Sequence, residues 1–170
     1  MSVEPIPSRP ALIFRHEAPE DQPAIEVLLD RAFGPGRFVK SSERVREIAE
    51  FAPELSFCAW SEGRLLGVVR MWRVRVGGVE AAFLGPLAVD SDERSAGLGG
   101  QLVERACAAA GKAGEAAVLL VGDGPYFDRF GFSAGLARDV IMPGPVDQRR
   151  VLARAFKPLS EGLRGRVAAR

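Results

Sequence analysis

Residues 84–113 read LGPLAVDSDERSAGLGGQLVERACAAAGKA, and this stretch decides the fold. Its first six residues are an apolar run, which predicts a strand that ends at Asp90. The polar triplet 91–93 predicts a turn. Residues 101–113 then place apolar side chains at helical spacing, which predicts an amphipathic helix. The stretch is therefore expected to form a strand, a glycine-rich loop at 94–100 and a helix.

The glycine-rich loop, residues 94–100, leads into the N-terminus of the predicted helix. Amide N–H groups in the first turn of a helix have no helical acceptor, and the helix dipole favours an anion there. Gly97, Gly99 and Gly100 allow a ligand to approach the backbone closely and permit a positive φ. Arg94 can add a charge-assisted hydrogen bond. The loop is therefore predicted to bind a phosphate-bearing ligand.

Two common phosphate-binding motifs do not fit this loop. A dinucleotide fingerprint needs a third glycine at the position where the chain has Leu102. A nucleotide P-loop ends in Gly-Lys followed by Ser or Thr, whereas the pair Gly111-Lys112 is followed by Ala113 and lies late in the helix. The sequence thus predicts an anion site of another type.

The 170-residue chain is 47% hydrophobic and 26% charged, as is usual for a globular protein. Its 23 Lys and Arg balance 22 Asp and Glu, so the net charge of +1 does not indicate binding to nucleic acid or a membrane surface. The N-terminus lacks the features of a signal peptide and no apolar run is long enough to span a membrane, so a cytoplasmic protein is expected. Cys58 and Cys107 are expected to be small core residues. Since His16 is the single histidine, neither a metal site nor a disulfide is expected.

Periodicity along the chain predicts alternating strands and helices. Apolar runs predict strands at 11–15, 55–60, 64–76, 79–89, 116–121, 140–142 and 151–156. Helical spacing predicts further helices between Asp21 and Gly34, from about 42 to 51, and from 126 to 130. The pair Gly77-Gly78 predicts a hairpin. The order β-α-α-β-β-β-α-β-α-β-β indicates a mixed α/β layer structure.

The spacing of Arg94, Gly97 and Gly99 between this strand and this helix resembles the acetyl-CoA site of the GNAT superfamily of N-acetyltransferases. The predicted order of elements is also the order found in that superfamily. A second motif, YFDRFGF at 126–132, resembles the short helix that ends in Gly-Phe after the family's fifth strand. The resemblance is therefore carried by two motifs and by the order of the elements.

The resemblance implies a single-domain α/β protein, residues 1–170 with a core at about 11–156. Its mixed central sheet would have helices on both faces and two parallel strands, ending at Val89 and Val121, that splay apart. Acetyl-CoA would lie in the gap as the co-substrate, without a metal. The implied ligands of acetyl-CoA are Leu87, Ala88, Val89, Arg94, Ser95, Ala96, Gly97, Leu98, Gly99, Gly100 and Arg129.

Acylation of an amine needs the neutral amine and a partner for the leaving thiolate. A lysine-like amine has a pKa near 10.4, so its neutral form costs roughly 4–5 kcal/mol at pH 7. A backbone N–H near Val89 is a candidate oxyanion donor. The general base stays open among several titratable side chains, namely Glu26, Glu80, Asp90, Asp123 and His16.

Tyr126 is the single tyrosine of the chain, and it lies in the motif where the family usually carries its general acid. It stands one residue before the usual tyrosine position, which Phe127 occupies here. Neighbouring helix residues point about 100° apart, so the two positions are not equivalent. Tyr126 is interpreted as the catalytic acid. The alternative is that its ring only packs against Phe127 and Phe130.

The sequence therefore predicts an acetyl-CoA-dependent N-acetyltransferase that moves an acetyl group to a primary amine by direct attack. The alternatives are a CoA-binding regulatory or degenerate domain without transferase activity, and a transferase that uses a longer acyl-CoA. The expected partners are acetyl-CoA and an amine acceptor, with no nucleic acid and no membrane; a homodimer is compatible with the sequence. Four basic residues would favour an acidic acceptor, although surface helices are often this charged: Arg37, Lys40, Arg44 and Arg46.

Overall fold

The computed structural model describes residues 11–34, 41–159 and 162–170, and the side chains of residues 41 and 94–96 lie outside that description. The strands are β1 (Ile13–His16), β2 (Glu50–Phe51), β3 (Phe57–Ser61), β4 (Arg64–Val76), β5 (Val79–Val89), β6 (Ala117–Val121), β7 (Asp139–Ile141), β8 (Val151–Ala155) and β9 (Arg164–Ala168). The α-helices are α1 (Gln22–Phe33), α2 (Ser41–Ile48), α3 (Leu98–Lys112) and α4 (Gly124–Asp128). Short 3-10 turns are η1 (Pro19–Asp21), η3 (Pro53–Leu55), η4 (Ser91–Ala96) and η5 (Gln148–Arg150).

Nine strands of the described ranges form one sheet, whose main path runs β1-β3-β4-β5-β6-β8. Neighbours on this path are antiparallel except for β5 and β6, which run parallel. The short linker Gly77-Gly78 joins β4 to β5 directly, whereas α3 carries the longer crossover from β5 to β6. The predicted mixed sheet is therefore confirmed.

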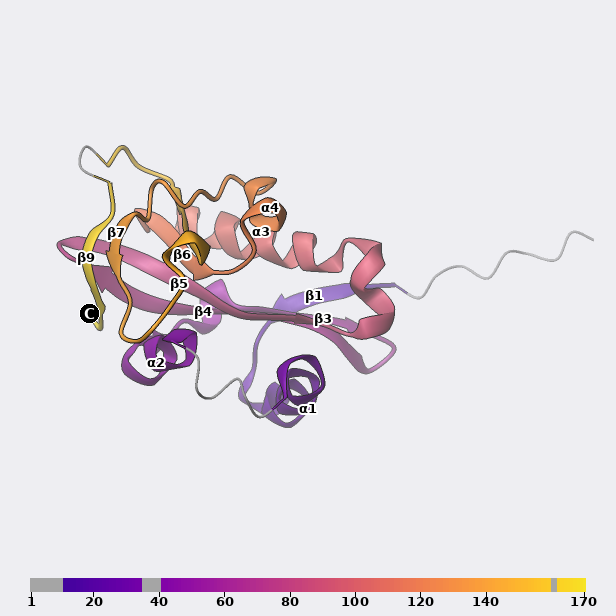
Figure 1. The fold of residues 1–170 in the computed structure, drawn as a ribbon. Coiled ribbons are helices and arrows are strands. Elements are labelled where there is room, and N and C mark those ends of the chain that lie inside the picture. Colours follow the sequence, from indigo (N-terminus) through magenta and orange to yellow (C-terminus); the bar gives the residue numbers. More distant parts are fainter. Residues whose placement is uncertain (1–10, 35–40, 160–161) are drawn as a thin grey trace, which may run out of the picture.

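Helices cover both faces of the sheet, with α1 and α2 on one face and α3 and α4 on the other (Figure 1). The inner face of α3 includes Leu102 and Val103, which have no exposed surface and pack in one cluster with Met71 of β4. On the opposite face, Ile25 of α1 packs in one cluster with Val68 of β4. Amphipathic helices thus bury the two longest strands, β4 and β5, from both sides.

The parallel strands β5 and β6 pair over a short distance. Their register joins Ala82 to Val118 and Phe83 to Leu119, and no further pair of these strands follows among the described residues. β5 continues to Val89 and β6 to Val121. The predicted splay, with pairing only toward the N-terminal ends, is confirmed.

A β-bulge in β5 explains why the two strands part. Met71 of β4 faces Leu84 and Val69 faces Leu87, so β5 uses one more residue than β4 over this interval. The interval contains Pro86, which has no N–H to donate to a neighbouring strand. Because a bulge bends the strand that carries it, β5 stays paired with β4 and turns away from β6.

Two helices begin earlier than the sequence predicts. α3 begins at Leu98 because Gly97, at φ 76°, forms its N-cap in the left-handed region. α4 begins at Gly124 rather than at 126, because the Asp123 side chain accepts a hydrogen bond from the N–H of Tyr126 at 3.2 Å. The predicted element types are right, and the capping residues explain the shifted boundaries.

The prediction of a helix up to residue 51 is wrong at its end. α2 ends at Ile48, and Glu50–Phe51 form the short strand β2. Glu50 pairs with Arg73 and Phe51 with Trp72 of β4. The partner strand lies more than 20 residues further along the chain, so local periodicity does not report this pairing.

The chain also has a strand that the sequence does not predict, since the run at 151–156 was expected to be the last. β9 pairs in parallel with β7 and antiparallel with the end of β4. Arg170, just beyond β9, donates to the carbonyl oxygens of Val74 at 3.1 Å and Ala81 at 2.8 Å, and it forms an ion pair with buried Glu115. Contacts with distant strands therefore hold this segment.

Cys58 and Cys107 are buried, and burial raises the pKa of their thiols to about 12 and about 11. They are core residues, as expected.

No helix in the described ranges is long and apolar enough to cross a membrane. Over the same ranges, His, Cys, Asp and Glu side chains do not gather in a group of three that would hold a metal ion.

Asp90 ends β5 and fixes the turn that leads to α3. Its side chain accepts hydrogen bonds from the N–H of Asp92 at 3.1 Å and from Nη2 of Arg64 at 2.9 Å, and the residue is buried. The Asp92 amide, followed by the Arg64 guanidinium, lowers the pKa of the Asp90 carboxyl. The ionised form therefore stabilises the fold above the ordinary pKa of aspartate, and this stabilisation is lost as the pH falls through the lowered pKa.

We expect Asp90→Asn to lower the free energy of unfolding by about 1 kcal/mol at pH 7, because the charged acceptor of two hydrogen bonds is lost. The difference from the native protein should shrink below pH of about 4, and urea unfolding at both pH values measures it. The control is Asp92→Asn, whose side chain is 79% exposed and 3.9 Å from Arg64. An equal loss at low and neutral pH would contradict the assignment.

Candidate active site

Two cavities adjoin where β5 parts from β6. The α3 cavity, of about 1130 Å³, is lined by the C-terminal half of β5, the first turns of α3, and α4. The α1–α2 cavity, of about 600 Å³, is lined by α1, α2, β4, the bulge of β5 and the end of β6. Leu87 and Phe33 line both cavities. The two cavities therefore meet at these residues, beside the parted strands.

The α3 cavity brings together most of the predicted acetyl-CoA ligands. Those that line it are Leu87, Ala88, Val89, Gly97, Gly99, Gly100 and Arg129. Leu98 instead belongs to the core and is 2% exposed. The side chains of Arg94, Ser95 and Ala96 lie outside the described residues; their backbone forms the end of η4, directly before α3.

The N-terminus of α3 opens onto the α3 cavity. A Cβ built on Gly97 would meet no atom within 4 Å, so this position faces open space. The first-turn amides that follow have no helical acceptor, and the helix dipole adds a positive potential. A phosphate group fits this position because its oxygen atoms would accept hydrogen bonds from these N–H groups.

Gly99 and Gly100 have a second role, which the sequence does not reveal. A Cβ on Gly99 would lie 2.9 Å from the hydroxyl oxygen of Tyr126, and one on Gly100 would lie 3.0 Å from the ring of Phe130. A side chain at either position would therefore require the Tyr126 or Phe130 side chain to shift. The two glycines therefore let the side chains of Tyr126 and Phe130 pack directly against the start of α3.

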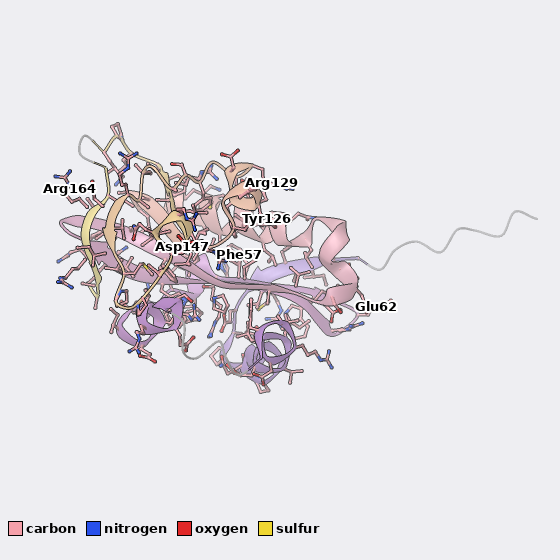
Figure 2. The ribbon with its side chains drawn as sticks, in the orientation of Figure 1. Phe57, Glu62, Tyr126, Arg129, Asp147 and Arg164 are labelled. Carbon is pink, nitrogen blue, oxygen red and sulfur yellow. The ribbon has the colours of Figure 1, made fainter. Side chains whose placement is uncertain are left out.

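Tyr126 lines the α3 cavity, and its ring packs edge-on against Phe127 and Phe130, with centroids 4.9 and 5.5 Å away. Arg129 lies over the Tyr126 ring at 5.0 Å, and Figure 2 shows both at α4, on the α3 side of the sheet. Burial raises the pKa of Tyr126 against the opposing charge of Arg129, so its hydroxyl stays protonated at neutral pH. Phe127, at the usual tyrosine position, lines the α1–α2 cavity instead. Tyr126 thus offers a hydrogen-bond donor to the α3 cavity.

The α1–α2 cavity has an apolar rim near the opening and charged walls further away. Leu87, Leu120 and Phe127 lie at the parted strands. Glu26 and Phe33 line the cavity from one face of α1, two turns apart. The mixture of apolar and ionic groups suits a small polar acceptor.

Arg70 of β4 lines the α1–α2 cavity, although it belongs to no motif of the sequence. Its Nε and Nη2 atoms donate to the Glu17 carboxylate at 3.1 and 2.8 Å. Burial raises the pKa of the Glu17 carboxyl, although the Arg70 guanidinium opposes this shift. The signal in the sequence is a charged residue inside an apolar strand, LLGVVRMW at 65–72.

The candidate bases separate by position. Glu26 and Asp123 line the α1–α2 cavity, and Asp123 also caps α4. Asp90 lines neither cavity and is bound to Arg64. The remaining two also line neither cavity: Glu80 lies at the start of β5 beside Arg75, and His16 stacks on Phe57.

The basic residues expected to favour an acidic acceptor are only partly brought to this cavity. Arg46 lines the cavity and binds the neighbouring Glu43, while Arg44 is exposed on α2 and does not line it. Arg37 and Lys40 lie outside the described residues. Arg46 is therefore the one member of that group that the structure places at the cavity.

Comparison with known proteins agrees with this geometry. Residues 23–132 match the Acetyltransferase (GNAT) family. An uncharacterized N-acetyltransferase of Escherichia coli K12, YhbS, is 34% identical over 131 residues, which cover 76% of this chain and 78% of that protein. The crystal structure of E. coli YhbS in complex with CoA has a TM-score of 0.78 at 27% identity, over 96% of this chain and 92% of that chain. A GNAT acetyltransferase from Brucella melitensis in complex with acetyl-CoA has a TM-score of 0.69 at 27% identity, over 94% and 96% of the two chains.

The family match runs from α1 to the Gly-Phe pair after α4. It therefore includes β5, the glycine-rich loop, α3 and the parted strand β6. The structural matches extend over nearly the whole chain. The fold, the open N-terminus of α3 and both comparisons lead to one conclusion: the chain belongs to the GNAT family of N-acetyltransferases.

Proposed function

We propose that this enzyme transfers the acetyl group of acetyl-CoA to a primary amine by direct attack, with acetyl-CoA in the α3 cavity and the amine in the α1–α2 cavity. The observation that carries the proposal is the junction of the two cavities at Leu87, where β5 and β6 part. Each substrate has its own cavity, and the reacting atoms meet at the opening. This arrangement suits direct transfer without a covalent enzyme intermediate.

In this proposal the N-terminus of α3 holds the pyrophosphate of acetyl-CoA. The backbone of residues 94–100 supplies the amides, and the edge of β5 at residues 87–89 pairs with the pantetheine arm as an added strand would. That edge of β5 carries no ladder to β6 beyond Phe83. Arg129 adds a positive charge to the wall of the α3 cavity. Arg94, Ser95, Ala96 and Leu98 would act through their backbone groups.

The chemistry follows from the groups at the opening. The amine nitrogen forms a bond to the thioester carbonyl carbon, the C–S bond breaks, and its electron pair leaves on sulfur. We assign Glu26 as the acceptor of the amine proton, because it lines the acceptor side while Asp123 is used to cap α4. Tyr126 donates a hydrogen bond to the departing sulfur; its raised pKa makes full proton transfer less favourable.

A CoA-binding domain without transferase activity is the second candidate function. The observation in its favour is that Phe127, which has no proton to donate, holds the usual position of the acid. Acetyl-CoA binding without release of thiol in the presence of any primary amine would favour this alternative over transfer.

Gly97→Val should abolish binding of acetyl-CoA, because the added side chain would project into the α3 cavity. Gly114→Val is the matched control: Gly114 also has a positive φ and open space around it, but lies at the far end of α3 and outside both cavities. At one hundred times the dissociation constant, acetyl-CoA should add about 2.7 kcal/mol to the stability of the native and control proteins. Thermal shifts measure this, and equal stabilisation of both variants would refute the proposed phosphate site.

Tyr126→Phe should lower kcat by roughly 10- to 1,000-fold, because the hydroxyl stabilises charge that develops only in the transition state. The dissociation constant of acetyl-CoA should barely change. Steady-state kinetics with a good acceptor and a binding titration measure the two quantities. Weaker acetyl-CoA binding with an unchanged kcat would instead make Tyr126 a ligand of the cofactor, in line with its position beside Gly99.

Glu26→Gln should lower kcat/KM at pH 7 by about 100-fold or more, because the amine loses its proton acceptor. The defect should shrink toward pH of about 10, where the amine is already neutral. The pH profile of kcat/KM measures this recovery. Glu20→Gln, an exposed residue outside both cavities, is the control. A defect of the same size at all pH values would show that Glu26 is not the base.

A further inference from the structure

Arg70 is a charged residue in the apolar strand β4, and only 14% of its side chain is exposed. The Glu17 carboxylate, itself 5% exposed, binds the edge of the guanidinium that carries Nε and Nη2. The guanidinium carbon lies 4.7 Å from the ring of Phe51 and 5.4 Å from that of Trp72. Trp72 is fixed in turn, because its indole N–H donates to the carbonyl oxygen of Gly85 at 2.6 Å. Arg70 is therefore held in one orientation before any ligand binds.

The Nη1 group of the guanidinium remains available for a ligand. In the part of the chain that the structure describes, Nη1 of Arg70 has no hydrogen-bond partner, and Arg70 lines the α1–α2 cavity. A preordered guanidinium loses little entropy when it binds an anion, and a carboxylate matches its donors. A purely structural ion pair with Glu17 would not require a place in the cavity wall.

Arg70 is also connected to the proposed base. Its Nη2 donates to Oε1 of Gln22 at 3.3 Å, and Nε2 of Gln22 donates to Oε1 of Glu26 at 2.9 Å. One amide group thus separates the cationic and anionic side chains along the same cavity. Because two hydrogen bonds and one amide group link the two side chains, a single small ligand can lie near both of them.

We propose that the acceptor is a small amino carboxylate, whose carboxylate binds Arg70 while its amine faces Glu26. This assignment rests on the proposed function, since it names the class of acceptor for the same transfer. Two other charged side chains of the cavity have a partner of opposite charge beside them. Arg46 binds Glu43, and Asp147 is bound by Arg149.

The native enzyme provides the first test. Release of thiol from acetyl-CoA is first compared for three four-carbon amines: γ-aminobutyrate, butylamine and putrescine. Two shorter pairs are then compared, glycine with methylamine and β-alanine with ethylamine. Each kcat/KM is calculated with the concentration of the neutral form of the amine, so that differences in amine pKa do not affect the comparison. At least one amino carboxylate should exceed its matched alkylamine by roughly 10- to 100-fold, as expected for a hydrogen bond between charged groups. Equal values in every pair, or a preference for putrescine, would overturn the proposal.

A double variant tests the residue. Arg70→Gln alone would leave the buried Glu17 without its counter-ion, so Glu17→Gln and Arg70→Gln are combined. The ratio of kcat/KM between the best amino carboxylate and its alkylamine should fall to about one. A structural role would lower both values together and preserve the ratio, which would overturn the assignment. Arg75→Gln is the control and should keep the native ratio, because Arg75 lies on the same strand, pairs with exposed Glu80 and lines neither cavity.

A binding measurement separates this proposal from the proposed function. N-acetyl-γ-aminobutyrate and N-butylacetamide, the matched products, are titrated calorimetrically into the CoA-bound native protein. Tighter binding of the carboxylate by roughly 10-fold or more would support the role of Arg70 even if no amine is acetylated, in which case only the proposed transfer fails. Equal affinity of the two products would overturn the role of Arg70 whatever the activity. Should the double variant not fold, the native ratio and this titration decide the question.

Discussion

The loss of pairing between β5 and β6 is the constraint on which the rest of the structure depends. β5 cannot pair fully on both sides, because the bulge around Pro86 keeps it in register with β4 and bends it away from β6. The resulting opening joins the α3 cavity to the α1–α2 cavity at Leu87. It also leaves an edge of backbone groups on β5, which an extended ligand can use in place of a neighbouring strand. The bulge in the sheet thus lies where the two cavities meet.

The start of α3 serves both the site and the packing around it. Gly97 faces open space, whereas Gly99 and Gly100 lie against the side chains of Tyr126 and Phe130. The same short sequence therefore exposes amides to the α3 cavity and brings the Tyr126 hydroxyl close to them. A side chain at either of the last two glycines would displace the Tyr126 or Phe130 side chain. These two requirements explain why the first turn of α3 contains consecutive glycines, although glycine within a helix lowers its stability.

Electrostatics divide the site into two different environments. The α3 cavity combines helix-terminal amides with Arg129, which suits phosphate groups. The α1–α2 cavity instead carries both signs of charge, held in place by the chain from Glu17 through Arg70 and Gln22 to Glu26. Its buried end, the ion pair of Arg70 and Glu17, is tolerated because each charge has its partner.

The sequence by itself determined the strand, loop and helix of residues 84–113 and the hairpin at Gly77-Gly78, while the parting of the two parallel strands was implied by the resemblance to the family. These are local patterns, since glycine position and side-chain period depend on neighbours in the chain. The tertiary structure decided what depends on distant partners. β2 and β9 exist because β4 offers them an edge, Gly99 is needed because of Tyr126, and Arg70 enters the site because Glu17 and Trp72 fix it there. Contacts between residues tens of positions apart leave no periodic trace in a single sequence, so only the fold reveals them.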